Sequence, residues 1–409
     1  MSVRVAVTGL GCISALGQGV PATWAALTEG VCGIRTLSRR HPDADRIQIN
    51  GPAAIVDKVD SAAVENFAGR KVTAQLDPVS TFAVVATHEA LEDSGLLSEP
   101  KVLDEAVIVY GGASGGNLTL EEAYSRILLR GQSTVHPLTI PKYMSSAPVS
   151  QLSMLFGVRG LAFTVASACS SSAHAIGEGA HMIRAGRAKV ALVGGADASI
   201  NFASWYAWTA LQAMATDTCR PFSIDRKGMV LGEGAATLIL EDLDHANARG
   251  ARIYGEVIGL GGSSDAGHLT APSPEGAGKA VRAAYADADL DPTTPAVVSA
   301  HGTGTPLNDK TEAEVMRAVL GDSLGRHRVI ATKSAHGHLL GAGGAIEFLT
   351  GLLALKESVA PPILNYVGPD PECDLPLALG EAKPFEAEVL VSNSFAFGGL
   401  NSVLIARRA

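Results

Sequence analysis

Cys169 is the side chain whose setting in this sequence best suits a nucleophile. It stands in Val165-Ala-Ser-Ala-Cys169-Ser-Ser-Ser-Ala-His174, where a strand-like run leads through small residues into a helical stretch over 172–185. A cysteine at the start of a helix faces free backbone N–H groups, which favour its thiolate form. Small neighbours also allow a sharp turn and access for a substrate. The alternative is a buried structural cysteine, the commonest fate of a free cysteine.

His301 lies in a loop that could bring an imidazole to such a nucleophile. The segment Ser299-Ala-His301-Gly-Thr303-Gly-Thr305-Pro306 begins as the end of a strand and continues as a Gly/Thr loop. Such a loop is not ordinary core, although a merely solvated histidine remains the alternative.

A second pair of histidines follows a lysine closely. His336 and His338 come after Lys333 and precede a Gly-rich helical stretch that carries Glu347. A cation near two imidazoles keeps them neutral, and a neutral imidazole still donates a hydrogen bond. We expect no metal here, because no carboxylate stands at a supporting spacing.

Two further glycine clusters follow strand-like runs. Gly9-x-Gly11 comes after the opening strand, but Ser14 stands where a dinucleotide-binding fingerprint needs its third glycine. We therefore predict a turn between a strand and a helix. Near the C-terminus, Phe397 precedes two glycines, which leaves backbone N–H groups available unless the segment is a simple β-turn.

Short apolar runs alternate with Ala-rich stretches, which predicts an α/β protein with strands buried on both faces. The predicted strands are Val3–Val7, Ala106–Tyr110, Val190–Val193, Ala236–Leu240, Val297–Ala300 and Val389–Val391. The predicted helices are Pro21–Glu29, Ser80–Ser94, Ser172–Ala185 and Gly344–Leu355. A helix over 241–250 followed by a strand over 253–258 suggests a division into halves 1–250 and 251–409. Each half has a Gly/Ala-rich helix opened by Cys169 or His338, so we expect two fused copies of one α/β unit.

Composition excludes several classes of protein. The net charge of −9 and the aromatic fraction of 5% argue against nucleic-acid binding. Five scattered cysteines without a CxxC pair predict neither a disulfide framework nor structural zinc. The N-terminal MSVRVAVTGLGCISALG reads as a strand and a turn rather than a signal peptide, and no apolar run approaches the roughly 18 residues of a membrane span. We expect a cytoplasmic protein.

The motifs occur together in one order: Cys, then His-Gly-Thr-x-Thr-Pro, Lys-x-x-x-Gly-His and Asn-Ser-Phe-x-Phe-Gly-Gly. This order resembles the β-ketoacyl-[acyl-carrier-protein] synthases, which are condensing enzymes. The resemblance covers the chain from Val5 to Ile405, and it is nearest to the synthase II type and the ketosynthase subunit of type II polyketide systems. It implies the thiolase fold, with two pseudo-duplicated α/β halves in five αβαβα layers.

The resemblance implies that Cys169 accepts an acyl chain as a thioester, with the backbone N–H groups of Cys169 and Phe397 as the oxyanion hole. Phe397 would also gate the two half-reactions. His301 and His338 would stabilise the enolate left when malonyl-carrier protein loses CO₂.

Supporting roles are implied for four more residues. Lys333 and Glu347 would form an ion pair that orients the histidines. Thr303 and Thr305 would contact phosphopantetheine, which arrives on the acyl carrier protein, so no separate cofactor is expected. A thiolase would need a second cysteine near Phe397, and none is there.

The sequence departs from the family pattern at the acyl tunnel. Ser114 aligns with a bulky aliphatic position of that tunnel, and Thr139 aligns with an aromatic that the partner subunit usually brings to its floor. Both changes shorten the side chain and add a hydroxyl that needs a hydrogen-bond partner. We therefore expect a deeper or more polar tunnel, suited to a longer or unsaturated chain.

Two other departures concern charged residues. His336 stands where the family usually has a non-ionisable residue, and we assign it no catalytic role. Arg70 and Lys71 are half of a paired-basic helix, and with Arg220 they are the residues that we expect to dock an acidic carrier protein.

Together the departures favour the active ketosynthase subunit of a type II polyketide system, polyene systems included. A homodimeric synthase II of fatty-acid elongation is the alternative. We expect either a homodimer or a heterodimer with a chain-length-factor-like subunit.

Overall fold

The computed structural model describes residues 3–409, and its core is a mixed sheet of eleven strands. Met1 and Ser2, with which the N-terminal segment interpreted above begins, lie outside the described residues. The strands of the N-terminal half are β1 (Val5–Ser14), β5 (Val107–Gly111), β6 (Ala162–Val165), β7 (Val190–Asp197) and β9 (Gly234–Asp242). Those of the C-terminal half are β10 (Gly255–Ser264), β11 (Ala296–Ser299), β12 (Arg328–Ile330), β15 (Val389–Ala396) and β16 (Leu400–Arg408).

The order of the strands shows the duplication. The sheet runs β12-β11-β15-β16-β10-β1-β9-β7-β5-β6, with β2 (Gly17–Gln18) paired to β1. In each half the third strand along the chain is at the outer edge, followed by the second, fourth, fifth and first. The halves join where β1 pairs antiparallel with β10, from Val5 opposite Val257 to Val7 opposite Gly255.

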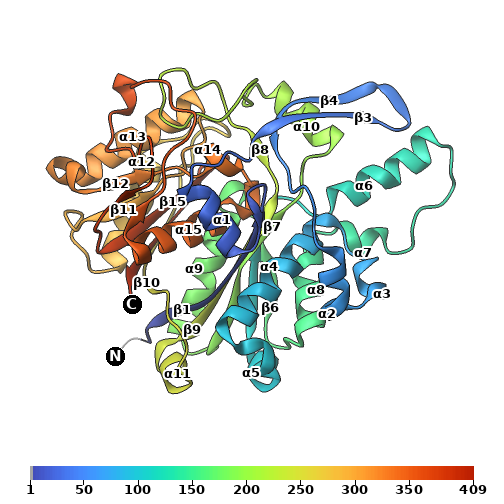
Figure 1. The fold of residues 1–409 in the computed structure, drawn as a ribbon, viewed down its shortest axis with the longest axis horizontal. Coiled ribbons are helices and arrows are strands. Elements are labelled where there is room, and N and C mark those ends of the chain that lie inside the picture. The colour runs from blue at the N-terminus through green and yellow to red at the C-terminus, as the bar shows by residue number, and fades with distance from the viewer. Residues whose placement is uncertain (1–2) are drawn as a thin grey trace.

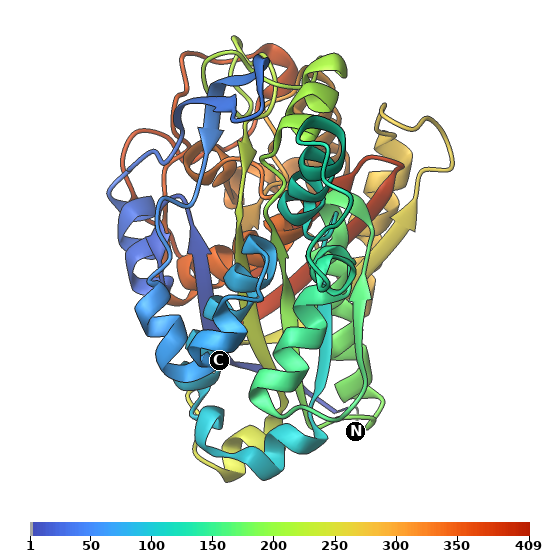
Figure 2. The same ribbon diagram turned by 90° about the vertical axis from the view of Figure 1, so that its right-hand side faces the viewer.

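Helices cover both outer faces of the sheet and fill the space between its halves (Figures 1 and 2). The outer helices are α4 (Pro78–Ser94) and α8 (Ala147–Phe156) on the N-terminal half, and α12 (Pro274–Asp287) and α13 (Pro306–Leu320) on the C-terminal half. Between the halves, α9 (Ser171–Arg184) and α15 (Gly343–Glu357) contact each other and strands of both halves. The predicted thiolase-like αβαβα layers are confirmed, with the joint between β1 and β10 as an addition.

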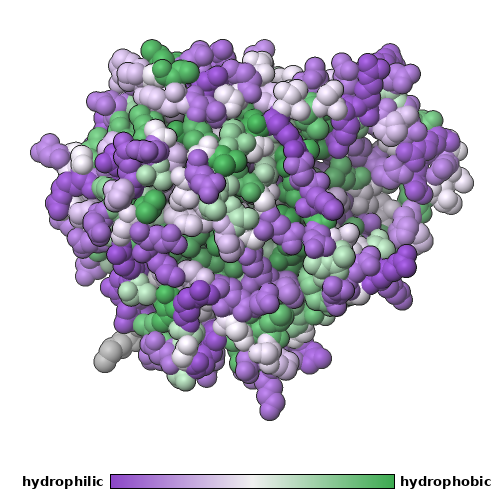
Figure 3. All heavy atoms as spheres, viewed as in Figure 1, coloured by the Kyte–Doolittle hydropathy of each residue, from purple (hydrophilic) through white to green (hydrophobic). Residues whose placement is uncertain are grey.

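The remaining elements are short and lie mostly around this core. The helices are α1 (Val20–Thr28), α2 (Ser61–Ala68), α3 (Arg70–Thr73), α5 (Pro100–Glu105), α6 (Asn117–Tyr124), α7 (Thr139–Tyr143), α10 (Phe202–Ala210), α11 (Leu243–Ala248) and α14 (Lys333–His336). The strands are β3 (Arg35–His41), β4 (Ala44–Ala54), β8 (Leu231–Gly232), β13 (Val359–Ala360) and β14 (Lys383–Pro384). The β3–β4 hairpin projects from the core, and Figure 3 shows it covered with hydrophilic side chains.

Most predicted elements lie within a few residues of observed ones, but one prediction is wrong. The predicted helix over 241–250 is observed as α11, which spans only Leu243–Ala248 because β9 continues through Asp242. The predicted turn at Gly9-x-Gly11 lies inside β1. A Cβ at Gly9 or Gly11 would overlap the carbonyl oxygens of α4, so these glycines allow a helix to lie directly on the strand.

A second pair of glycines that lets a helix lie on a strand occurs 250 residues later, in β10. A Cβ at Gly259 or Gly261 would collide with the carbonyl oxygens of Ala284 and Ala280 in α12. Both strands also shift register just before the first glycine. The repeated Gly-Leu-Gly is visible in the sequence, and it was the signal for the duplication that our sequence analysis missed.

Two further observations concern the chain as a whole. All five cysteines are free, and only Cys32 is exposed. Within residues 3–409, every helix is too short or too polar to cross a lipid bilayer.

Gly11→Ala should lower the free energy of unfolding by roughly 1–3 kcal/mol, because the new methyl group must push α4 away from β1. Urea unfolding monitored by circular dichroism measures this. Gly325→Ala is the matched control, because a Cβ there meets no atom within 4 Å. Equal stability of the two variants would contradict the packing role of Gly11.

Candidate active site

One cavity of 340 Å³ collects side chains from both halves of the chain. Cys169 enters it from a 3₁₀ turn, Ala168–Ser170, that leads directly into α9. The other reactive residues come from three separate C-terminal segments that line the same cavity, namely His301, His338 and Phe397. The structure therefore brings together the four residues that the sequence analysis singled out.

Hydrogen bonds of the neighbouring serines fix the position of Cys169. Ala168 has a left-handed backbone, with φ of 50°. Ser171 holds this bend, since its hydroxyl donates to the Ala168 carbonyl (2.6 Å) and accepts the Ser167 N–H (2.9 Å). The Ser170 hydroxyl lies 2.9 Å from the Ser394 carbonyl, which ties the turn to β15. The sequence analysis treated these serines only as small residues, although three serines in a row were a signal for such contacts.

The Cys169 thiol is protonated at neutral pH, which corrects the expectation of a thiolate. Only 8% of the residue is exposed, and burial raises the pKa of Cys169 to about 11. The positive charge of Lys333 and hydrogen bonds from the backbone N–H groups of Phe397 and Cys169 lower this pKa, and the carboxylate of Asp197 raises it. Desolvation thus outweighs the effect of the helix start.

His301 and His338 face each other across the cavity as neutral hydrogen-bond donors. Their ring centroids are 5.4 Å apart and the rings are almost perpendicular. The Lys333 ammonium lies 3.3 Å from Nδ1 of His301, and the Leu340 N–H donates to Nδ1 of His338 (3.2 Å). Because both groups can only donate, each Nδ1 accepts and each neutral ring carries its proton on Nε2. Burial, followed by the charge of Lys333, holds the pKa of both histidines well below the usual value.

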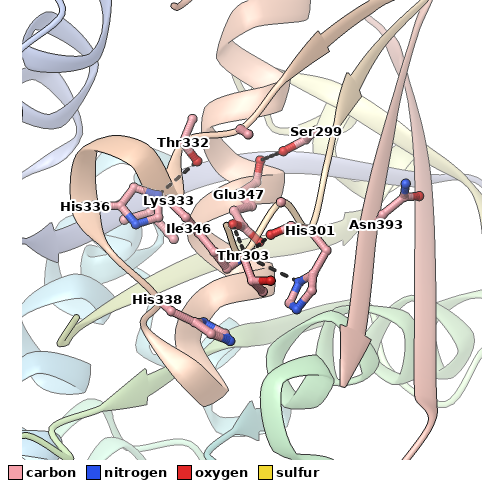
Figure 4. A network of polar contacts seen from close by, with 12 residues as sticks. Ser299, His301, Thr303, Thr332, Lys333, His336, His338, Ile346, Glu347 and Asn393 are labelled. Atoms are coloured by element: carbon pink, nitrogen blue, oxygen red, sulfur yellow. Dashed lines mark hydrogen bonds and ion pairs between the residues drawn. The ribbon is translucent and has the colours of Figure 1, made fainter. Parts of the chain in front are cut away.

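Lys333 joins the histidine loops to the central helix α15. Its ammonium pairs with the Glu347 carboxylate and donates to the His301 carbonyl (2.7 Å), and both members of the ion pair are buried. Burial raises the pKa of Glu347 to about 7, while Lys333 acts to lower it. Figure 4 shows His301 and His338 on one side of this pair and His336 on the other.

Two carboxylates of α13, not identified in the sequence analysis, hold the His301 loop. Glu312 accepts the backbone N–H groups of His301 and Gly302, each at 2.8 Å. Asp309 accepts the N–H of Gly304 (3.2 Å). Both carboxylates are buried in the helix that begins right after the Gly/Thr loop. Acidic residues early in that helix were the available signal for this anchoring.

His336 is fully buried and does not line the cavity. Its Nδ1 donates to the Gly337 carbonyl (2.8 Å), and its Nε2 accepts the Thr332 hydroxyl (2.9 Å). Burial lowers the pKa of His336 to about 3, so the ring is neutral. Through these contacts His336 stabilises the turn that leads to His338.

The structure does not place Ser114 in this cavity. Its hydroxyl lies 2.7 Å from that of Ser199 and accepts an N–H of Asn117 (3.0 Å), and the Ser199 hydroxyl donates to Asp197. The hydroxyl therefore already has, within the chain, the hydrogen-bond partners that we expected it to need.

Thr139 is also absent from the cavity lining and is satisfied within its own chain. It is 8% exposed, and its hydroxyl donates to the His136 carbonyl (2.7 Å).

The basic residues expected to dock a carrier protein differ in how exposed their side chains are. Arg70 and Lys71 are exposed on α3. Arg220 is not free, because it pairs with Asp217 at 2.8 Å and only 15% of its side chain is exposed.

Thr303 and Thr305 line the cavity, and their hydroxyls are 2.8 Å apart. They form a pair of polar groups in a wall that is otherwise largely apolar.

Alkylation of Cys169 by iodoacetamide should accelerate about tenfold per pH unit between pH 7 and pH 9, because the reactive thiolate is a minor species below the pKa. Mass spectrometry of the Cys169 peptide separates this reaction from alkylation of the exposed Cys32. A rate that levels off below pH 8 would contradict a thiol pKa of about 11.

Comparison with known sequences places most of the chain in one family. Residues 2–246 match the model "Beta-ketoacyl synthase, N-terminal domain", and residues 254–367 match "Beta-ketoacyl synthase, C-terminal domain". Nodulation protein E of Rhizobium meliloti (strain 1021) is 40% identical over 99% of both chains. The 3-oxoacyl-[acyl-carrier-protein] synthase 2 of Staphylococcus aureus (strain MRSA252) is 34% identical and covers 100% of this chain and 99% of its own.

Solved structures agree over the full length. "The ishigamide ketosynthase/chain length factor" is 32% identical, with a TM-score of 0.93 and complete coverage of both chains. A type II polyketide ketosynthase solved with its acyl-carrier protein is 26% identical, with a TM-score of 0.87 and complete coverage of both chains. On these matches and this fold, the chain belongs to the β-ketoacyl synthase family of condensing enzymes, which are acyltransferases.

Proposed function

We propose that this chain is the active ketosynthase subunit of a specialised type II system. In this proposal it condenses malonyl-carrier protein with an acyl chain held on Cys169. The observation that carries the proposal is the cavity in which the thiol, two backbone N–H groups and two Nε2–H donors converge.

In the first half-reaction the Cys169 sulfur attacks the thioester carbonyl of an acyl-phosphopantetheine. The oxyanion accepts hydrogen bonds from the N–H groups of Cys169 and Phe397. Its collapse breaks the bond to the phosphopantetheine sulfur. That sulfur leaves as a thiol with the proton lost by Cys169, so the exchange needs no net acid or base.

In the second half-reaction a malonyl thioester occupies the cavity, and its carbonyl oxygen accepts the Nε2–H groups of His301 and His338. The electrons of the bond to the carboxylate form an enolate, and CO₂ leaves. The enolate carbon attacks the Cys169 thioester, and the Cys169 sulfur departs as a thiolate that takes a proton from water, which leaves a chain longer by two carbons. Neutral donors suit this step, since they stabilise the enolate without protonating it.

Phe397 is placed to separate the two half-reactions. Its ring stacks on Trp208 with centroids 5.8 Å apart, and both rings line the cavity beside Cys169. The proposed gate opens when Phe397 leaves this stack and clears the path to the sulfur. Gly398 and Gly399 have φ of 81° and 69°, values that favour glycine and let the chain turn sharply after the aromatic.

A second cavity offers room for an acyl chain. It measures 740 Å³ and lies between α6, α10 and the β3–β4 hairpin, with a mainly apolar wall. Asn117 lines this cavity and hydrogen-bonds Ser114, which does not line the active-site cavity. Ser114 in turn adjoins Ala113, whose N–H donates to Asp197 (3.3 Å).

The same region supports a role for a second subunit. Exposed apolar side chains cluster on α6, the turn of π-helix that extends it, and the neighbouring helices, including Tyr124, Leu128, Leu129, Ile140 and Met154. Strand β6 lies at the edge of the sheet, and Figure 2 shows it and α6 on this face. An exposed strand edge beside apolar surface is suited to pairing with another chain. We infer that a subunit of the same fold covers this face and closes the second cavity.

The similarity to these relatives favours a specialised pathway. Identity to Nodulation protein E is higher than to the S. aureus synthase 2, and one structural match is a ketosynthase/chain length factor. Homodimeric fatty-acid elongation is the second candidate, supported by the synthase 2 match over the whole chain.

His338→Ala should accept an acyl group on Cys169 yet release CO₂ from malonyl-carrier protein on the order of 10²–10³-fold more slowly, since the lost hydrogen bond acts only on the enolate. Acyl transfer is read by the mass of the Cys169 peptide, and decarboxylation by labelled CO₂. His336→Ala is the matched control and should slow decarboxylation less. Normal CO₂ release from His338→Ala would overturn the assignment.

Purification from the native host should yield a second subunit of similar size, and the intact mass of the acylated Cys169 peptide should show an unsaturated or oxygenated chain. Leu128→Glu should release that subunit, because it places a charge in the proposed interface. Val367→Glu is the control, since Val367 is also exposed but lies in the C-terminal half. A homodimer that carries only saturated chains would favour fatty-acid elongation.

A further inference from the structure

The active-site cavity has a buried end and an exposed end. Cys169, His301 and His338 are each at most 8% exposed, which marks the inner end. Leu269 and Leu307 line the same cavity and are 73% and 60% exposed, which marks the mouth. A thioester that reaches Cys169 must therefore leave the far end of its carrier arm at the mouth.

The cavity wall carries almost no charge. In the part of the chain that the structure describes, Lys227 is the only lysine or arginine of the lining, and no aspartate or glutamate lines it. The other basic side chain at the mouth is His268, whose Nδ1 already accepts the backbone N–H of Thr270 (3.1 Å). Among the described residues, Lys227 is thus the one permanent cation that lines the cavity itself.

The ammonium of Lys227 is largely available to a ligand. Its nearest carboxylate is that of Asp225, at 3.6 Å, a separation too long for a hydrogen bond. About half of each side chain, 51% and 53%, is exposed. The neighbouring Arg226 differs, because it is 5% exposed and paired with Asp370.

The backbone around Lys227 is fixed to the loop that carries Thr303 and Thr305. The Gly228 N–H donates to the Gly304 carbonyl (3.0 Å), and Gly228 has φ of 147°. A Cβ at Gly228 would lie 2.6 Å from the Ala213 carbonyl oxygen, so the segment is tightly packed. The backbone that carries Lys227 therefore has a set position relative to the two threonine hydroxyls, and its flexible side chain extends from that point.

We propose that Lys227 binds the phosphate group at the outer end of a phosphopantetheine arm whose thioester lies at Cys169. This inference rests on the proposed function, because it takes phosphopantetheine as the carrier. The arm presents an anion at one end, amides along its length and a thioester at the other. The cavity presents Lys227 at its mouth, the threonine pair along its wall and Cys169 at its base. An exposed ion pair of this kind contributes modestly to binding and is weakened by salt.

The test measures protection of Cys169 from iodoacetamide and needs no turnover. The probes are S-methyl pantetheine and its 4′-phosphate as the methyl phosphodiester, which differ only in the anion. In the unmodified protein the phosphodiester should protect at about fivefold lower concentration, the factor expected of an exposed ion pair. This preference should fall to about one in Lys227→Gln, and it should shrink at 1 M salt in the unmodified protein.

Lys310→Gln is the matched control. Lys310 is also 51% exposed and paired with an exposed carboxylate, Glu372, but it does not line the cavity. This variant should keep the fivefold preference. Equal protection by both probes in the unmodified protein, or an unchanged preference in Lys227→Gln, would overturn the role of Lys227 while leaving the proposed function standing.

Protection by neither probe, together with no decarboxylation of malonyl-carrier protein, would overturn the proposed function and this inference with it. S-methyl coenzyme A, which has no thiol to react with iodoacetamide, serves as a third probe. Much stronger protection by S-methyl coenzyme A than by the phosphodiester would show that the site recognises a nucleotide, which would also contradict the inference.

Discussion

The buried ammonium of Lys333 is the charge on which the rest of the site depends. It touches the Glu347 carboxylate, the His301 carbonyl and Nδ1 of His301 at once. Burying a charge is costly unless it is paired and hydrogen-bonded, and here nearly every direction around the ammonium is occupied by an acceptor. The same positive charge adds to burial in lowering the pKa of both imidazoles, and it lowers the pKa of the Cys169 thiol against the larger effect of burial. One cation therefore shifts the pKa of all three reactive groups, although burial has the larger effect on each.

The duplicated fold explains how these groups meet. The central helices α9 and α15 belong to different halves and contact each other at small residues. A Cβ at Gly344 would lie 2.9 Å from the Cβ of Ala173, so the close approach requires glycine there. Because α9 follows Cys169 and α15 carries Glu347, this contact brings the nucleophile of one half beside the ion pair of the other. On the outer faces, the glycines of β1 and β10 likewise allow close approach, so that α4 and α12 lie directly on the strands.

Buried carboxylates hold the loops around the reactive residues in place by accepting hydrogen bonds from the backbone. Glu312 and Asp309 hold the His301 loop through backbone N–H groups, and Asp197 joins Ala113 to Gly341, close to His338. Loops of this kind carry function but have no regular hydrogen bonding of their own, so side-chain acceptors must hold them. The burial that makes these acceptors strong also raises the pKa of Asp197 and Asp309 to about 6.

Residue types and their order, with the family resemblance that they carry, were enough to predict the fold class, the family and the reactive residues that share the cavity, but they placed Ser114 and Thr139 in an acyl tunnel to which the structure does not assign them. They did so because the reactive segments are local, with Cys169 before a helix and His301 after a strand. The charge state of the thiol, the free or paired state of Arg220 and the partners of Ser114 could not be predicted in this way. Each depends on groups brought from elsewhere in the chain, such as Ser199, which lies 85 residues from Ser114. The degree of burial likewise exists only once the two halves have packed. Desolvation and long-range hydrogen bonds are properties of the tertiary structure, and they decided what the residues named by the sequence can do.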